Sequence, residues 1–208
     1  MKVNYKRLMD AEIEKLKATG KKPTLLLHAC CAPCSSAVLE VLSDVFDITL
    51  FFYNPNISPE SEFYFRLDEL KRLTDEMNLS DIGIIAPEYN DNEFFKITEG
   101  LENLAEGGAR CKKCYRLRIS KSVEYAKANG FDYVTTTLSI SPHKNADWLN
   151  EIGTELSDKA GIKYLCSDFK KGEGYKRSCD LSKIYNLYRQ DYCGCVYSKN
   201  LQKEKMQK

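Results

Sequence analysis

Hydrophobic positions along this chain follow two patterns that succeed one another. Short continuous apolar runs are typical of strands that are buried on both faces of a sheet. They predict five strands, over residues 24–27, 47–53, 82–86, 132–138 and 162–166. The first run, Thr24-Leu25-Leu26-Leu27, ends at His28.

Between these runs, apolar residues recur every three or four positions, which is the spacing of one face of an amphipathic helix. This spacing predicts helices over residues 4–18, 34–42, 58–77, 91–104, 111–128, 146–160 and 181–189. Ser58 is predicted to cap the third helix, with Pro59 at its first helical position. Gly107-Gly108 and Asn129-Gly130 are predicted to end the helices that precede them.

Strands that alternate with helices predict an α/β fold, a doubly wound and mainly parallel sheet of about five strands. In such sheets ligands bind in the crevice at the carboxyl ends of the strands. We expect a single domain over residues 1–208, with an N-terminal helix within residues 1–22. The charged tail, residues 199–208, is expected to fray.

Composition narrows the functional classes. Hydrophobic residues make up 43% of the 208 positions, which is enough for a substantial core, and the net charge of +1 excludes a globally basic nucleic-acid binder. No apolar run approaches the roughly 20 residues that a membrane span needs. Residues 1–22 are charged throughout and do not resemble a signal peptide. We therefore expect a cytoplasmic protein with no membrane partner.

Nine cysteines are unusual for such a chain, and in a reducing cytosol they are not expected to form a disulfide framework. Seven of them fall into three close groups: Cys30, Cys31 and Cys34; Cys111 and Cys114; and Cys193 and Cys195. The first group lies between a predicted strand and the helix that follows it, where the helix N-terminus favours thiolate over thiol. The sequence thus predicts a cysteine-rich site for metal ligation or redox chemistry at the carboxyl ends of the strands.

A C-x-x-C pair can place both sulfur atoms on one metal, because the turn between them folds back. Cys31/Cys34 and Cys111/Cys114 therefore suit a four-cysteine zinc site or an iron–sulfur cluster, and buried thiols without a partner are the third reading. Zinc would leave the remaining grouped cysteines unused, whereas a cluster with a second metal or a redox pair uses all seven. Cys193-Gly194-Cys195 could form an easily reduced disulfide or supply thiolate ligands.

Basic residues gather at the start of the helix predicted over 111–128, with no acidic residue among positions 110–121. An anionic partner such as a phosphate backbone would offset cations at a helix N-terminus, although a solvated basic face is an equally good reading. Lys170, Lys171, Lys176 and Arg177 form a second basic group with tyrosines nearby. His28 is either a structural histidine or a proton source beside the thiols, and His143 lies after the fourth strand, where a substrate would bind.

Five motifs together resemble the cobalamin-independent epoxyqueuosine reductase family, QueH. They are HACCAPCS at 28–35, RCKKCYRLR at 110–118, TTLSISPHKN at 136–145, DFKKGEGYKRS at 168–178 and YRQDYCGCVYS at 188–198. They stand in family order and span nearly the whole chain. The resemblance implies a fold related to the nucleotide-binding HUP class. It also implies the last step of queuosine synthesis: reduction of the epoxide of epoxyqueuosine, at the wobble position of tRNA, to an alkene.

The resemblance further implies a [4Fe–4S] cluster and an additional mononuclear iron. On the matching positions, cluster or iron ligation falls to Cys30, Cys31, Cys111 and Cys114. Cys34, Cys193 and Cys195 are then further metal ligands or redox thiols, and we favour ligation. The side chains of Cys30 and Cys31 are expected to diverge and to serve different metals.

The remaining site residues carry proton transfer and tRNA binding. Asp191, Tyr192 and His28 are candidate proton donors. The expected substrate or tRNA contacts are Arg110, Arg116, Arg118, His143, Lys144, Lys171 and Tyr175. An electron donor that the sequence does not identify completes the reaction. Two rival functions remain: a thiol–disulfide oxidoreductase that uses Cys193 and Cys195, and a zinc-stabilised RNA-binding module.

Overall fold

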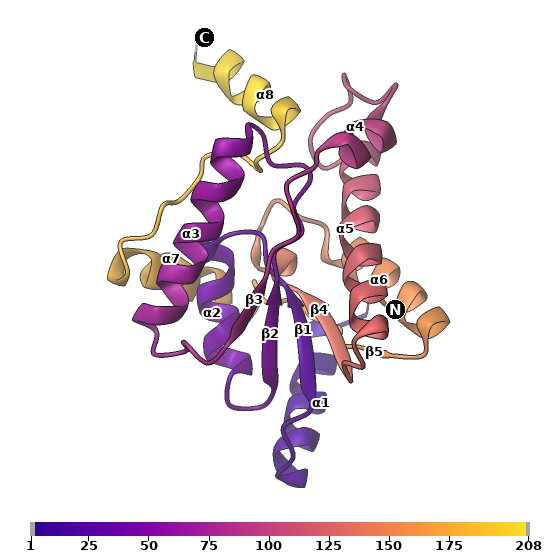
Figure 1. The fold of residues 1–208 in the computed structure, drawn as a ribbon, viewed down its shortest axis with the longest axis vertical. Coiled ribbons are helices and arrows are strands. Elements are labelled where there is room, and N and C mark those ends of the chain that lie inside the picture. The colour runs from indigo at the N-terminus through magenta and orange to yellow at the C-terminus, as the bar shows by residue number, and fades with distance from the viewer. Residues whose placement is uncertain (1–2, 207–208) are drawn as a thin grey trace.

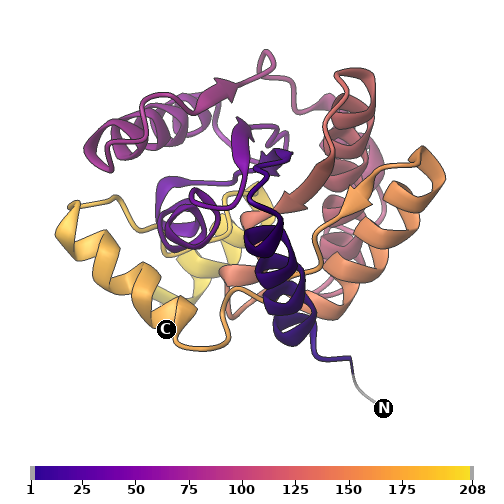
Figure 2. The same ribbon diagram turned by 90° about the horizontal axis from the view of Figure 1, so that it is seen from below.

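A five-stranded parallel sheet in the order β3-β2-β1-β4-β5 forms the centre of the molecule, with helices on both faces (Figures 1 and 2). The structure, a computed structural model, describes residues 3–206. The strands are β1 (Thr24–His28), β2 (Asp47–Phe51), β3 (Gly83–Ile85), β4 (Tyr133–Thr136) and β5 (Lys163–Tyr164). The helices are α1 (Tyr5–Thr19), α2 (Ala32–Leu42), α3 (Glu60–Glu76), α4 (Asn92–Thr98), α5 (Ala109–Ala128), α6 (Ala146–Ala160), α7 (Gly174–Ile184) and α8 (Val196–Met206), with a 3₁₀ turn at Thr137–Ile140.

Alternate side chains of β1 serve two different hydrophobic cores, because successive residues of a strand point to opposite faces. Leu25 and Leu27 pack with residues of α1, α2 and α3, whereas Leu26 packs with residues of α5 and α6. All three leucines are fully buried. This arrangement confirms the predicted doubly wound α/β sheet, and it explains why the first strand is an unbroken apolar run.

The carboxyl ends of β1 and β4 create the position for a site. β1 lies between β2 and β4, and its register pairs His28 with Phe51 on one side and with Thr136 on the other. The chain leaves β1 toward α2 and leaves β4 toward the 3₁₀ turn and α6. The strand order therefore reverses between these two strands, which is where doubly wound folds bind their ligands.

Three helices have bounds that differ from the predictions for identifiable reasons. Pro59, not Ser58, is the N-cap of α3, and the helix begins at Glu60. The helix predicted over 91–104 ends at Thr98, because Gly100 takes a left-handed conformation and Arg110 Nη1 binds the carbonyl oxygens that follow. The helix predicted over 181–189 instead spans Gly174–Ile184, and the chain turns at Asn186, whose φ is 44°.

The C-terminal region also differs from expectation. Residues expected to fray continue as the helix α8, Val196–Met206, and residues 207–208 of the predicted tail lie outside the described part of the chain.

The strand predicted over 132–138 ends at Thr136, whose Oγ1 accepts a hydrogen bond from the amide of Leu138 and starts the 3₁₀ turn. Among the described residues, no helix has the length and apolar character to cross a bilayer.

Close packing between α6 and β5 gives a test of this architecture. A Cβ atom at Gly153 would lie 2.1 Å from Cζ of Tyr164. We expect Gly153→Ala to lower the free energy of unfolding by about 1–3 kcal/mol through overpacking, despite the better helix propensity of alanine. Chemical denaturation measures the loss, and Tyr164→Leu in the same background should restore most of it. A Gly153→Ala variant as stable as the wild type would contradict this packing.

Candidate active site

The turn between β1 and α2 brings three thiols together. Cys31 has an extended backbone and is the N-cap of α2, and a proline follows within the first helical turn. The Sγ atoms of Cys30, Cys31 and Cys34 all lie within 4.8 Å of one another, and those of Cys30 and Cys31 are 3.7 Å apart. The expectation that Cys30 and Cys31 diverge was therefore wrong, since the turn directs both side chains to one point.

Hydrogen bonds among these three thiols shift their pKa values in opposite directions. Hydrogen bonds from Cys31 and Cys34 hold the pKa of Cys30 well below its usual range, aided by the charges of Lys144 and Arg118. The same hydrogen bonds raise the pKa of Cys31 to about 12 and that of Cys34 well above its usual range. Thr137 Oγ1 also donates to Cys30 Sγ, at 3.6 Å. Of the three thiols, Cys30 is therefore the one that loses its proton most readily.

The other four grouped cysteines line a second, small and mainly apolar pocket. Cys111 and Cys114 come from the first turns of α5, and Cys193 and Cys195 come from the segment before α8. Cys193 lines both this pocket and the larger cavity in front of Cys30. This grouping differs from the expected division, which joined Cys30 and Cys31 to Cys111 and Cys114 and set Cys34 apart.

Burial raises the pKa of three thiols of the second group. It raises the pKa of Cys114 to about 11 and that of Cys195 to about 12, and it also raises the pKa of Cys111. Backbone amides nevertheless point at two of the sulfur atoms: Gly107 N–H at Cys111 Sγ, 3.3 Å, and Ser198 N–H at Cys195 Sγ, 3.4 Å. Such donors favour negative charge on sulfur. The cysteines that line this pocket are therefore suited to act as metal ligands, because a thiol loses its proton when it binds a metal.

A buried guanidinium links the two cysteine groups. Arg118 of α5 donates from Nη2 to Asn54 Oδ1 and from Nε to His28 Nε2, the latter at 3.3 Å. Burial alone would lower the pKa of Arg118, but the nearby thiols of Cys114, Cys30 and Cys193 outweigh it and the pKa is raised. Arg118 therefore stays charged and places a fixed cation beneath the sulfur atoms.

His28 has a structural role in this arrangement. Its Nδ1 lies 2.8 Å from Thr136 Oγ1, the residue with which it is paired in the sheet, and its Nε2 lies 3.1 Å from the carbonyl oxygen of Tyr53. Burial and the charge of Arg118 lower its pKa to about 3, so the ring is neutral at physiological pH. The side chain is fully buried, which argues against the expected role as a direct proton donor.

Two of the arginines expected to contact tRNA are not on the surface. Arg110 and Arg118 are each only 2% exposed. Arg110 Nη1 donates to the carbonyl oxygens of Leu101, Glu102 and Leu104, which closes the loop before α5. Arg116 is exposed but is ion-paired with Glu155 of α6. Arg110 and Arg118 therefore act inside the protein, whereas Lys112, Lys113 and Arg116 remain exposed at this helix start.

Several other predicted residues do share one cavity. A hollow of about 340 Å³ lies in front of the Cys30–Cys34 turn, and His143, Lys144, Tyr175, Asp191 and Tyr192 all line it. The volume is within the usual range for small-molecule sites. Burial alone would lower the pKa of Lys144, but the thiols of Cys193, Cys30 and Cys34 outweigh it and raise that pKa.

Lys171 lies apart from this cavity. It is ion-paired with the buried Asp168 at 3.4 Å, and Lys170 pairs with the same carboxylate at 2.8 Å. The two lysines thus fix the loop that leads into α7.

Asn56 and Arg66 are among the residues of this cavity that sequence reasoning missed. Arg66 is 3% exposed, and Asn56 is 2% exposed. Arg66 stands four residues after Glu62 on a helix, a spacing that in sequence is typical of a surface ion pair. Only the packing of α3 under the C-terminal segment buries it, so no sequence signal separated it from the exposed arginines.

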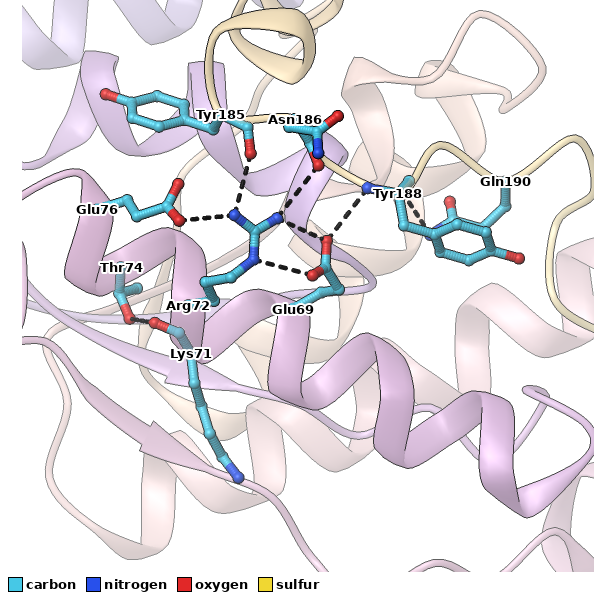
Figure 3. A network of polar contacts seen from close by, with 9 residues as sticks. All are labelled: Glu69, Lys71, Arg72, Thr74, Glu76, Tyr185, Asn186, Tyr188 and Gln190. Carbon is cyan, nitrogen blue, oxygen red and sulfur yellow. Dashed lines mark hydrogen bonds and ion pairs between the residues drawn. The ribbon is translucent and has the colours of Figure 1, made fainter.

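The segment that carries Cys193 and Cys195 is held against α3 by a polar network (Figure 3). Arg72 forms ion pairs with Glu69 and Glu76 and donates to the carbonyl oxygens of Tyr185 and Asn186. Glu69 also accepts a hydrogen bond from the amide of Tyr188, at 3.1 Å. These contacts anchor the chain just before the cavity-lining residues 189–193.

Gly194 allows the next part of this segment to pack closely. Its φ of 112° is one that side chains with Cβ rarely adopt, and a Cβ atom would lie 2.9 Å from Arg66 Nη1. Its carbonyl oxygen accepts a hydrogen bond from the amide of Ser58, at 3.0 Å. Glycine is therefore required between the two cysteines for both conformation and space.

Comparison with known sequences bears on the identity of this site. The sequence model of the family described as "Epoxyqueuosine reductase QueH" matches residues 25–201. The protein of that name from Streptococcus pyogenes serotype M1 is 39% identical, over 97% of this chain and 80% of its own length. Its namesake from Thermotoga maritima is 34% identical, over 88% of this chain and 93% of its own length. The chain belongs to the QueH family.

The family match includes all three cysteine groups and both cavities described above. Among solved structures, the NMN synthetase from Francisella tularensis superposes with a TM-score of 0.50 at 12% identity, over 93% of this chain and 77% of that one. At that identity the likeness concerns the fold alone. It agrees with the α/β fold predicted for this QueH chain.

The lowered pKa of Cys30 predicts selective alkylation. In metal-free protein at pH 7, iodoacetamide should modify Cys30 before Cys114 and Cys195, because only Cys30 has a lowered pKa. The Cys30 rate should fall as pH drops through that lowered pKa, whereas the other two thiols should react only as pH approaches their raised values. Peptide mass spectrometry measures the order, with Cys30→Ala as the control. Earlier modification of Cys114 would contradict the assignment.

The network around Arg72 predicts a local loss of order. Arg72→Leu removes the contacts to Glu69, Glu76 and two carbonyl oxygens, and should lower the free energy of unfolding by about 1–3 kcal/mol. Hydrogen exchange at residues 185–190 should become faster. Lys71→Leu is the matched control, since the neighbouring Lys71 makes only an exposed pair with Asp68. Equal effects of the two substitutions would count against the anchoring role.

Proposed function

We propose that this protein reduces epoxyqueuosine in tRNA to queuosine, using a [4Fe–4S] cluster and an adjacent iron held by its grouped cysteines. Membership of the QueH family carries the proposal, since the family model and the similar proteins bear the name epoxyqueuosine reductase. The seven grouped cysteines line two pockets that share Cys193. Neither a simple redox disulfide nor a single zinc site would use so many thiols.

The donor set of the Cys30–Cys34 turn fits a single metal ion. Sulfur ligands about 2.3 Å from a tetrahedral metal lie roughly 3.8 Å from one another. Cys30 and Cys31 have their Sγ atoms 3.7 Å apart, and the Cys34 Sγ lies within 4.8 Å of both. Three thiolates leave one coordination position, and all three residues line the substrate-sized cavity. We therefore assign the mononuclear iron to Cys30, Cys31 and Cys34.

We assign the cluster to the thiols of the second pocket, on their number. It offers four thiols, from Cys111, Cys114, Cys193 and Cys195, which is the number that a [4Fe–4S] cluster takes. Arg110 also lines it, and its buried Nη2 has no hydrogen-bond partner in the described structure. A buried cation with a free donor complements the negative charge of a thiolate-bound cluster. This assignment replaces the expected one, in which Cys30 and Cys31 joined the cluster.

When bound, these groups supply electrons and a Lewis acid for the epoxide oxygen, a role that zinc alone cannot fill. The protein's own residues bind and protonate the substrate. Reduction of the epoxide to the alkene takes up two electrons and two protons and releases water. Tyr192 is the first candidate donor, because burial raises its pKa and keeps its hydroxyl protonated, and Asp191 beside it is the second. Lys144 adds positive charge where negative charge on oxygen develops.

The tRNA would approach over the rim of the cavity. Tyr175, His143 and Arg189 line it, and Arg189 lies over the Tyr175 ring at 5.8 Å. An aromatic ring beside a guanidinium is suited to stacking with a base. Arg116 is exposed and is a candidate for a phosphate contact at the periphery. Lys171 lies apart from the cavity lining, so any contact that it makes with tRNA would also be peripheral.

Anaerobically purified protein tests the function. It should contain about five irons per chain and absorb at about 400 nm. With a chemical reductant, it should convert epoxyqueuosine-containing tRNA to the queuosine form. Cys114→Ser should lose the cluster and activity together, whereas Cys34→Ser should lose roughly one iron and most activity. Cys179→Ser, outside both pockets, is the control.

Two results would contradict the proposed reaction, and a third would contradict the ligand assignment. Colourless protein with one zinc would favour an RNA-binding module, and metal-free protein with redox-active Cys193 and Cys195 would favour a thiol oxidoreductase. Full iron retention in both Cys114→Ser and Cys34→Ser would refute the assignment of the ligands.

A further inference from the structure

The serine at position 198 contacts both cysteines of the C-terminal group. Its Oγ accepts a hydrogen bond from the amide of Cys193 at 3.0 Å, and its own amide donates to Cys195 Sγ at 3.4 Å. Ser198 is 3% exposed and belongs to the lining of the substrate-sized cavity. Neither metal ligation nor proton transfer, as assigned above, explains why a buried serine stands at this place.

These contacts form a variant of the capping box at the start of α8. The carbonyl oxygen of Cys195 accepts a hydrogen bond from the amide of Lys199 at 3.0 Å, so Cys195 is the cap residue of the helix. In a usual capping box, the side-chain oxygen of the cap accepts from the amide three residues later, and that residue reaches back with its own side chain. Here a sulfur atom replaces the oxygen, and Ser198 reaches back to Cys193. The helix start therefore fixes the chain on both sides of Gly194.

The first turn of α8 is held in place by contacts that do not involve the cysteines. The hydroxyl of Tyr197 lies 3.2 Å from Thr98 Oγ1, and the guanidinium of Arg110 lies 4.6 Å from the centre of the tyrosine ring. The same ring packs against Phe94 of α4, with ring centroids 6.0 Å apart. Ser198 thus projects from a turn that is fixed to α4 and α5, and its position is set from outside the cysteine loop.

A carboxylate orients the hydroxyl and connects the two halves of the second pocket. Ser198 Oγ donates to Glu106 Oε2 in a long contact of 3.3 Å, which leaves its lone pairs free to accept from the amide of Cys193. Glu106 lines both cavities, and the amide of the next residue, Gly107, donates to Cys111 Sγ at 3.3 Å. The loop before α5 and the segment before α8 are therefore joined through Glu106 and Ser198.

We propose that Ser198 is a positioning residue that sets the directions of the Cys193 and Cys195 sulfur atoms in the second pocket. A [4Fe–4S] cluster needs four thiolates directed at one centre, and hydrogen bonds around the sulfur atoms tune its reduction potential. The hydroxyl of Ser198 holds the backbone before Gly194, and its amide holds the sulfur after it. This role rests on the proposed function, because it takes Cys193 and Cys195 as ligands of the cluster.

Anaerobically loaded protein tests this role with two substitutions at one position. Ser198→Ala removes the hydroxyl, whereas Ser198→Thr keeps it. A chelator should remove cluster iron from Ser198→Ala roughly 10-fold faster than from the wild type, because losing a residue that orients metal ligands typically costs about 10- to 100-fold in affinity. The reduction potential of the cluster and the electron paramagnetic resonance spectrum of its reduced form should also shift. Ser198→Thr should restore the wild-type value of each measurement.

A second buried serine separates this role from general stability. Ser122 of α5 is 1% exposed, and its Oγ donates to the carbonyl oxygen of Arg118 at 2.8 Å. It is not among the residues that line the two cavities. Ser122→Ala and Ser198→Ala should both lower the thermal midpoint, since each loses a buried hydrogen bond. Only Ser198→Ala should change the rate of iron release, the potential and the spectrum.

Different results overturn different claims. A loaded Ser198→Ala variant with the iron release, potential and spectrum of the wild type would refute the positioning role and leave the proposed function intact. Equal changes in Ser198→Ala and Ser122→Ala would also refute it, because the serine would then act through general stability. Wild-type protein that loads no cluster would refute the proposed function and the positioning role with it.

Discussion

The burial of the Arg118 guanidinium is the constraint on which the rest of the site depends. A charge so deep in the protein is tolerated only when it is paired and hydrogen-bonded. Arg118 meets this requirement with His28 at the end of β1, with Asn54 after β2, and with the thiols around it. One side chain of α5 thereby ties the carboxyl ends of two strands to the cysteines of both pockets.

This arrangement explains why the only histidine of the first strand is neutral. A protonated His28 beside Arg118 would put two cations together without solvent, and its pKa falls to about 3. The imidazole instead spans β1 and β4, through Thr136, and accepts from the guanidinium. The positive charge available to the thiols then comes from Arg118 and Lys144, which do not titrate near neutral pH. In this chain, the positive charge beside the thiols therefore does not depend on protonation of a histidine.

The C-terminal segment closes the site from the other side. Arg72 and Glu69 hold residues 185–188 against α3, and the amide of Ser58 holds Gly194. Between these anchors the chain brings Cys193 to both pockets and covers Arg66. Two cysteine groups that are more than 150 residues apart in the chain thus become neighbours only because this segment returns across α3.

The sequence by itself determined the periodic elements and the inventory of chemistry. Continuous apolar runs indicated strands with two buried faces, and alternation with helical spacing indicated a doubly wound sheet, because those patterns depend only on neighbouring residues. Close spacing likewise indicated the cysteine groups, and the motifs indicated the family. Tertiary structure alone decided which groups share a pocket, that Arg110 and Arg118 are internal, and that Asn56 and Arg66 face the cavity. Those outcomes depend on strand order and on packing between segments that are distant in the chain. The local sequence around an arginine does not show whether its side chain is buried or exposed.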